Sequence, residues 1–367
     1  MQVAKIQELS NHETRLADGV ELIYGINDQP LLYNPDIGNY VRISSLGIKV
    51  VGWLNKGCTI EQIIERLTIE YQKPHEEVRP VVNNFLEQLR QARMLNIEPI
   101  PENLIGRSLG YVRKRPVFRI PLLKTTKKIT YPFSNLLGMF STKILFMIGA
   151  IIFLLAVSIV ALFLYKNSFL TTYGNVSWVI IISVIVIHLL LHEMTHATIL
   201  QRFGINIRQA GIGLLYYILP IAYVDTTDAY RLRNKYERAA VALGGPVFDI
   251  LGAAISTIIC LWGNMWWSNQ FQIIFKIQFA IFIINLNPLL PSDGFHAIES
   301  LMGELNMRRR ALHYFFCKIT FRSSPNYLAN LPKTKKIQYS LYTLLSVGYF
   351  VLIVYFMILF YRRLVSG

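Results

Sequence analysis

Long apolar runs separated by basic connectors make up most of the chain after residue 105. A membrane-spanning helix needs about 20 mostly apolar residues. Five runs are long enough and predict a polytopic α-helical membrane protein: residues 144–165, 177–200, 239–262, 271–290 and 338–361. A sixth apolar run, residues 211–224, is too short to span and contains Gly and Pro, so it predicts a re-entrant or interfacial hairpin covered by protein.

Residues 1–105 contain shorter apolar stretches and the ordinary charge content of a soluble domain. Three short strands are predicted first, at residues 20–26, 30–35 and 38–43. A helix capped by Ser44 or Ser45 should follow and extend to Leu54.

Two further helices are predicted in this part. Thr59 with Gln62 forms a capping box for a helix that ends near Tyr71. The last helix covers residues 76–94, with an apolar face at Val78, Val81, Val82, Phe85 and Leu89. The pattern predicts a small α+β, winged-helix-like domain, an architecture more typical of DNA binding.

These patterns divide the chain into five parts. The small domain covers residues 1–105, and a basic juxtamembrane linker covers residues 106–143. A membrane-embedded core follows at residues 144–300, then a basic connector at 301–337 and a C-terminal span at 338–367.

Composition agrees with a membrane protein. Hydrophobic residues make up 53% of the chain and charged residues only 16%, below the roughly 25% typical of soluble domains. The first 40 residues lack an apolar core, so no cleavable signal peptide is expected. The three cysteines, Cys58, Cys260 and Cys317, form neither a disulfide framework nor a CxxC pattern.

The positive charge is concentrated in segments next to the predicted membrane spans. The net charge is +15, and residues 107–128 hold eight Lys or Arg and no acid just before the first span. Such a segment favours the anionic lipids of a cytoplasmic leaflet, so we expect a lipid bilayer as partner and no nucleic acid. The connectors after the second and fourth spans are also basic. They predict a multi-pass cell-membrane protein with a cytoplasmic N-terminus, whose second and fourth spans run inward.

The second span contains ionisable groups that are costly in lipid. Within HEMTH, residues 192–196, His192 and His196 lie four residues apart and therefore on one helix face. This is the H-E-x-x-H pattern: two imidazoles that hold zinc, and a carboxylate, Glu193, that accepts a proton from water at the metal. A pair of core histidines with a buried glutamate is the alternative interpretation.

A catalytic zinc takes three protein ligands and leaves one position open. The fourth span ends in NLNPLLPSDGFHAIE, residues 285–299, on the same side of the membrane as HEMTH. Two prolines and a glycine break the helix there, and Asp293 lies at the break. We predict Asp293 as the third ligand rather than part of an ordinary turn.

HEMTH within a span, followed by N-x-x-P-x-x-P-x-D-G at residues 285–294, resembles the site-2 protease family of intramembrane zinc metalloproteases. The resemblance covers about residues 177–300, including GGPVFD at 244–249. It implies zinc bound by His192, His196 and Asp293. It also implies Glu193 as general base, and Asn285 as the group that polarises the scissile carbonyl or holds the substrate strand.

Other residues near these motifs have open roles. Asp249 occupies a place where many relatives carry asparagine. His188, one turn before His192, is either a pocket residue or a hydrogen-bonded core histidine, and Asp225 and Asp228 could tune the site or cap a helix. The candidate substrate-binding residues are Asn287, His188, Asp249, Tyr40, Val41 and Arg42.

The N-terminal phrases YNPDIGNYVRIS, LNKGCTIEQIIERL and VVNNFLEQLRQARML resemble PqqD-like domains. That resemblance implies binding of the leader of a ribosomally made, post-translationally modified peptide. The leader would add as a strand at the edge formed by residues 40–43. A DNA-reading winged helix is the alternative interpretation.

Together the motifs predict a zinc metalloendopeptidase that matures such a precursor peptide. Two alternatives remain open: a regulatory protease that cleaves a transmembrane signalling protein, and a non-catalytic immunity or export protein. The sequence predicts no oligomeric state.

Overall fold

The computed structural model describes residues 14–34, 39–97, 117–123, 126–166, 175–207, 209–215, 219–304, 306–321, 328 and 331–366. Two compact units divide the chain, Met1–Arg115 and Pro116–Gly367. Most of the predicted basic segment, residues 107–116 and 124–125, lies outside the described residues, as does Arg208 in the connector after the second span.

The first unit contains a three-stranded antiparallel sheet of order β1-β2-β3. The strands are β1 (Glu21–Tyr24), β2 (Pro30–Asn34) and β3 (Asn39–Arg42). β2 pairs with both neighbours, Leu32 opposite Leu22 on one side and Val41 on the other. The structure confirms the three short strands, and β3 forms an edge of the sheet.

Three helices follow in the predicted order: α2 (Ser45–Asn55), α3 (Ile60–Tyr71) and α4 (His75–Gln91). Ser44 caps α2 by accepting from the Gly47 amide at 3.1 Å. The predicted capping box of α3 is present, with both reciprocal bonds between Thr59 and Gln62.

The face that α4 buries differs in detail from the prediction. Val81 is 54% exposed, whereas Leu86 is fully buried. The buried side chains of α4 follow a stripe at Val78, Val82, Leu86 and Leu89, and Val81 lies beside it. This stripe packs against α2, α3 and Leu32 of β2 in one hydrophobic core.

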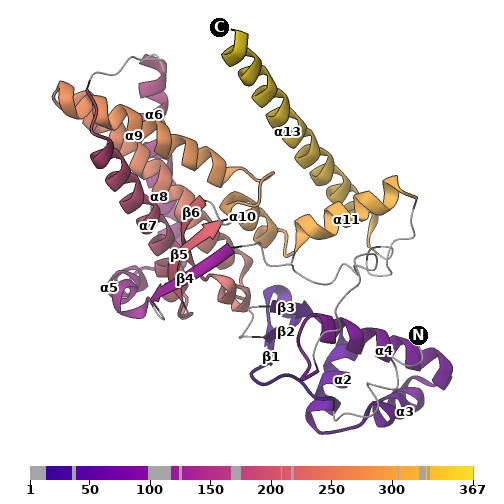
Figure 1. Ribbon diagram of the computed structural model, residues 1–367. Coiled ribbons are helices and arrows are strands. Elements are labelled where there is room, and N and C mark those ends of the chain that lie inside the picture. Colours follow the sequence, from indigo (N-terminus) through magenta and orange to yellow (C-terminus); the bar gives the residue numbers. More distant parts are fainter. Residues whose placement is uncertain are drawn as a thin grey trace. The chain divides into compact units, whose positions relative to one another are not determined.

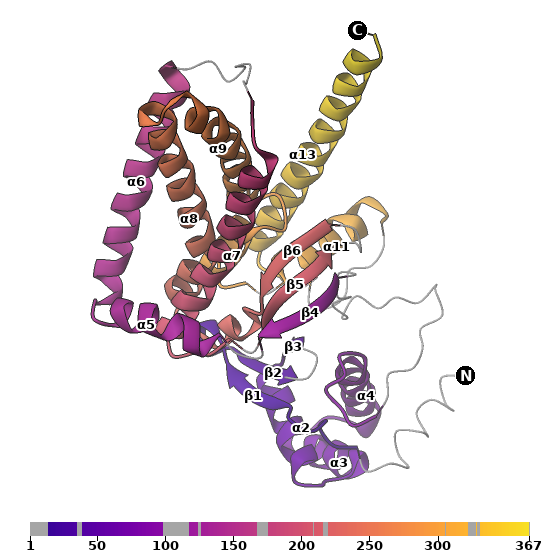
Figure 2. The same ribbon diagram turned by 60° about the vertical axis from the view of Figure 1, so that its left-hand side comes forward.

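The second unit is mostly helical (Figures 1 and 2). Within the described residues, five helices are long and apolar enough to cross a membrane. They confirm the predicted class of a polytopic helical membrane protein with a small N-terminal α+β domain. The five are α6 (Thr142–Lys166), α7 (Trp178–Arg202), α8 (Lys235–Trp262), α9 (Met265–Leu286) and α13 (Lys333–Ser366).

α9 lies several residues earlier than predicted. Asn264 caps its first turn by accepting from the Trp267 amide at 3.1 Å, so Trp266 and Trp267 belong to the helix. The helix ends at Leu286, because Asn287 precedes Pro288 and a residue before proline is disfavoured in the α conformation.

α8 is the central span of this unit. Within the most apolar stretch of each span, 61% of α8 is buried inside the protein, against 11–28% for the others. Ile250, Ala253 and Ala254 of α8 form a core with side chains of α6 and α9. Small residues on α8 allow this close approach, as is common where helices meet in lipid.

A second sheet lies at one end of this bundle and was predicted only in part. β5 (Ala210–Leu215) and β6 (Leu219–Val224) form the predicted hairpin, as an antiparallel pair of strands. β4 (Val117–Leu123), in the segment predicted as a linker, pairs with β5. Gly211 permits this pairing, since a Cβ there would lie 2.1 Å from the Ile120 carbonyl oxygen.

Short helices complete the unit at the same end. α5 (Lys127–Gly138) precedes α6, and the 3₁₀ helix η2 (Thr227–Arg231) precedes α8. α10 (Asp293–Leu301) follows α9, and α11 (Met307–Ile319) packs against α13. Arg202, at the end of α7, donates to the carbonyls of Leu137 and Phe140 at 3.0 and 2.9 Å, so the segment entering this unit is held at that end.

Candidate metal centre

α7 brings His192 and His196 to one buried face. Both side chains are about 5% exposed, and their ring centroids lie 4.9 Å apart. His196 Nδ1 lies 2.6 Å from the Val241 carbonyl oxygen, and His192 Nδ1 lies 2.8 Å from Asp249 Oδ1. Both partners are acceptors, so both Nδ1 atoms donate. The Nε2 atoms therefore present lone pairs, and they lie 3.2 Å apart.

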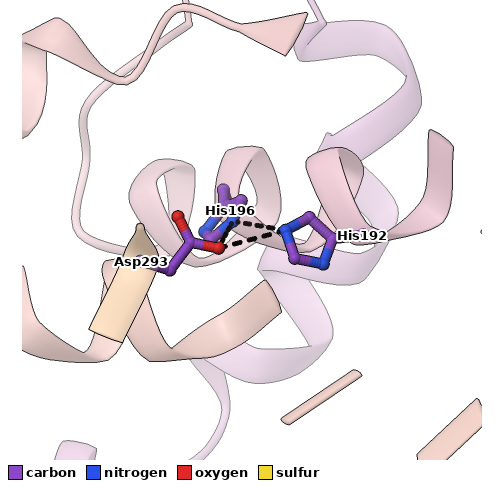
Figure 3. Close-up of side chains that lie close together, drawn as sticks. All are labelled: His192, His196 and Asp293. Carbon is purple, nitrogen blue, oxygen red and sulfur yellow. Dashed lines mark hydrogen bonds and ion pairs between the residues drawn. The ribbon is translucent and has the colours of Figure 1, made fainter. Parts of the chain in front are cut away.

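The break after α9 supplies the third group, Asp293. Ser292 caps α10 by accepting from the Phe295 amide, and its hydroxyl donates to the Asn287 carbonyl at 2.6 Å. Asn287 Oδ1 accepts from the Leu289 amide at 2.9 Å. This compact loop places Asp293 Oδ2 3.1 Å from His192 Nε2 and 3.3 Å from His196 Nε2 (Figure 3).

The three groups fit a zinc ion. Zinc holds imidazole nitrogens and carboxylate oxygens at about 2.0–2.2 Å, so tetrahedral ligand atoms lie about 3.3–3.6 Å from one another. The separations among the two Nε2 atoms and Asp293 Oδ2 are 3.2, 3.1 and 3.3 Å, at or slightly below the short end of that range. Two neutral imidazoles with one carboxylate are a ligand set of catalytic zinc sites.

The electrostatics of Asp293 agree with this arrangement. Burial alone would raise the pKa of its carboxyl group, but the two imidazoles beside it, His196 and His192, lower that pKa below its ordinary range. The side chain is therefore present as the carboxylate that a metal ligand must be.

Gly245 of α8 lets the backbone approach both imidazoles. A Cβ at this position would lie 2.4 Å from His192 Nε2 and 2.5 Å from His196 Nε2. GGPVFD is part of the predicted motif, but the close approach of the Gly245 backbone to the two imidazoles could not be predicted from the sequence. Any larger side chain at Gly245 would occupy the space between the two rings.

Asp249 lies behind the candidate ligands and not in an open pocket. Its side chain is fully buried and binds His188 as well as His192. Asn285 Nδ2 donates to Asp249 Oδ2 at 2.9 Å. Asn285 is thus held beside the candidate metal centre, and its action on a scissile carbonyl stays a prediction.

Glu193, the next residue after His192, points toward the sheet. Its Oε2 accepts from the backbone amide of Val224, the last residue of β6, at 3.0 Å. Because only one oxygen is held in this way, the other is available for a proton. The contact joins the predicted base to the edge strand β6.

The remaining candidates lie elsewhere. Asp225 accepts from the Thr227 amide at 3.1 Å, just before η2, whose cap residue Thr226 makes no side-chain cap bond. Tyr40, Val41 and Arg42 lie on β3 in the first unit. Val41 packs against that unit's core and Tyr40 stacks on Tyr33, so their side chains serve the fold.

Two family models match the chain. Residues 31–95 match Coenzyme PQQ synthesis protein D (PqqD), and residues 180–264 match Peptidase family M50. The second match includes His192, Glu193 and His196 and ends before Asp293. Both resemblances predicted from the sequence are confirmed.

Two curated proteins are similar over part of their length. "Putative peptide zinc metalloprotease protein YydH" of Bacillus subtilis is 29% identical over 131 residues, 36% of this chain and 51% of that protein. "Uncharacterized protein MJ0971" of Methanocaldococcus jannaschii is 30% identical over 80 residues, 22% of each chain. The match therefore spans about half of the Bacillus protein. No solved structure matches.

The family match over residues 180–264 includes the HEMTH part of the candidate metal centre, and within the described residues five helices are long and apolar enough to cross a membrane. The chain joins an N-terminal PqqD domain to a membrane domain of peptidase family M50, the family of the site-2 proteases.

Proposed function

We propose that this protein is a membrane-embedded zinc metalloprotease that hydrolyses a peptide bond in the precursor of a ribosomally made, post-translationally modified peptide. The observation that carries the proposal is the convergence of His192 Nε2, His196 Nε2 and Asp293 Oδ2 in a chain that also contains a PqqD domain. A signalling protease would need the first feature and has no use for the second.

The chemistry divides among a few residues. When bound, zinc acts as a Lewis acid and lowers the pKa of its bound water to about 7. Glu193 accepts the proton of the attacking water and passes it to the leaving amine. Asn285, beside Asp249, donates a hydrogen bond to the substrate carbonyl or to its strand. Val224, the last residue of β6, donates to Glu193, so an extended substrate backbone would lie beside the edge of β6.

The proposed topology brings recruitment and cleavage to one side of the membrane. The candidate ligands lie in the second half of α7 and just after α9, so they are near one end of both helices. The chain enters the membrane unit through β4 and α5, which are held at that same end. With a cytoplasmic N-terminus, a leader captured by the PqqD domain would be presented on the side of the site.

The leader would bind by adding a strand to β3. The Ile43 amide donates to the Pro30 carbonyl of β2 at 3.1 Å. Because successive residues of a strand alternate in direction, the amides of Tyr40 and Arg42 point to the outer edge. A leader strand would accept from those amides.

Replacing Arg42 with proline is therefore expected to weaken leader binding while leaving the sheet intact. Proline removes an outward amide that no strand of this sheet uses, and it tolerates an extended backbone at an edge. The matched control is Arg42→Ala, which removes the same side chain and keeps the amide. Leader binding to the full chain would be measured by fluorescence anisotropy with a labelled peptide.

We expect Arg42→Pro to bind the leader about tenfold more weakly, because one hydrogen bond between neutral backbone groups is lost. Arg42→Ala should bind like wild type. Equal binding by Arg42→Pro and wild type would contradict strand addition at β3. Failure of wild type to bind any leader would favour a protease for signalling proteins.

A further inference from the structure

A chain of buried polar side chains runs from the interior of the membrane unit to His192. Its members come from three spans: His188 from α7, Ser256 and Asp249 from α8, and Gln278 from α9. All four side chains are at most 4% exposed. Polar groups at this depth are costly unless they are paired.

The hydrogen bonds define a single direction along the chain. Asp249 Oδ1 accepts from His192 Nδ1 at 2.8 Å and from His188 Nε2 at 3.0 Å. Because His188 donates through Nε2, its Nδ1 is the acceptor of the neutral ring, and Gln278 Nε2 lies 3.2 Å from it. The Ser256 hydroxyl then donates to Gln278 Oε1 at 2.7 Å.

Every donor in this series meets an acceptor, so the orientation of each group is fixed by the next. Reversing His188 would leave Asp249 facing a lone pair and Gln278 facing an N–H. The pattern also explains a glycine of α8. A Cβ at Gly252 would lie 2.8 Å from His188 Nδ1 and 3.2 Å from Gln278 Nε2, so only glycine leaves room for this contact.

We propose that Ser256, Gln278, His188 and Asp249 are positioning residues that hold His192 in the tautomer with a free Nε2 lone pair and place a second carboxylate behind the zinc. The inference rests on the proposed metalloprotease and deepens it. Asp249 accepts through both oxygens, Oδ1 from two imidazoles and Oδ2 from Asn285. Such a group is a carboxylate and not a carboxylic acid.

Two consequences follow for the metal. Without Asp249, His192 could place its proton on Nε2, where it would face the ion instead of binding it. In addition, the two carboxylates Asp249 and Asp293 together balance a divalent cation, which matters where lipid surrounds the site. Partners of this kind change metal affinity by about 10–100-fold when they are removed.

The test is zinc affinity, measured on the purified full chain in detergent by competition with a chromophoric chelator. The variants are Asp249→Ala, His188→Phe and Gln278→Leu, which remove the bonds one link at a time; the last two keep approximate volume. Gln270→Leu is the matched control. Gln270 also lies on α9 and is fully buried, and it binds Ser177 and Asn175 at the other end of the helix.

We expect zinc affinity to fall about 10–100-fold in Asp249→Ala and about tenfold in His188→Phe and Gln278→Leu, with Gln270→Leu equal to wild type. Cobalt absorption spectra of the same proteins should change in the first three variants only, because the orientation of His192 changes. Melting temperatures of the metal-free proteins report any shared loss of stability.

If His188→Phe and Gln278→Leu showed the zinc affinity and cobalt spectrum of the wild-type protein, the inference would be overturned. The proposed metalloprotease activity would still stand if the wild-type protein bound zinc and cleaved peptide. An equal loss in Gln270→Leu would also overturn it, because the bonds would then act only through helix packing. If the wild-type protein bound no zinc, the proposed metalloprotease function would be contradicted, and the inference would fail with it.

Discussion

Replacing Glu193 with glutamine is expected to abolish peptide cleavage while zinc stays bound. Glutamine has nearly the same shape, and its amide oxygen can still accept from Val224, so the local fold should persist. It cannot accept the proton of the attacking water. General bases contribute about 10²–10⁴-fold to rate, and the loss of cleavage should lie in that range.

The measurement pairs mass spectrometry of the cleaved precursor with the zinc content of the same preparation. Glu237→Gln makes the same change in the first turn of α8, outside the metal group, and should cleave like wild type. Wild-type cleavage by Glu193→Gln would show that another residue is the base. Loss of zinc from this variant would make Glu193 a ligand instead.

Replacing Asp293 with alanine is expected to remove both zinc and cleavage. The carboxylate is one of three convergent groups, and the two imidazoles left behind do not make a catalytic zinc site. The loss of affinity should exceed the 10–100-fold that removal of a supporting partner costs. Helix α10 should persist, since Ser292 supplies its cap.

Zinc content after dialysis checks this expectation, together with circular dichroism as a test of folding. Asp225→Asn alters another carboxylate outside the metal group, at the start of the segment after β6, and should keep its zinc. If Asp293→Ala retained one zinc per chain, the third ligand would have to come from elsewhere.

Local patterns in the sequence predicted much of the fold because they depend on neighbouring residues. The Thr59–Gln62 capping box and the Ser44 cap are bonds across one helical turn, and both are present. The i, i+4 spacing of His192 and His196 places them on one face in any α-helix. The position of Asp293 near the two histidines could be predicted because the helix break after the fourth span lies on the same side of the membrane as HEMTH.

What could not be predicted depends on contacts between distant segments. β4 pairs with β5 across roughly ninety residues of chain, and an isolated strand of that length has no distinctive period. The chain Ser256–Gln278–His188–Asp249 joins three spans, so no single stretch of sequence reveals it. α9 starts early because Asn264 caps it. The span was predicted from apolar residues alone, so this cap did not enter the prediction.

Cleavage of a leader-bearing precursor by the purified full chain in lipid nanodiscs, before and after zinc is removed with a chelator, tests the proposed activity. We expect defined cleavage products with zinc present, none after chelation, and recovery when zinc is returned. Cleavage that persists without metal, or a zinc-loaded protein that leaves the precursor and its leader untouched, would contradict the proposed activity.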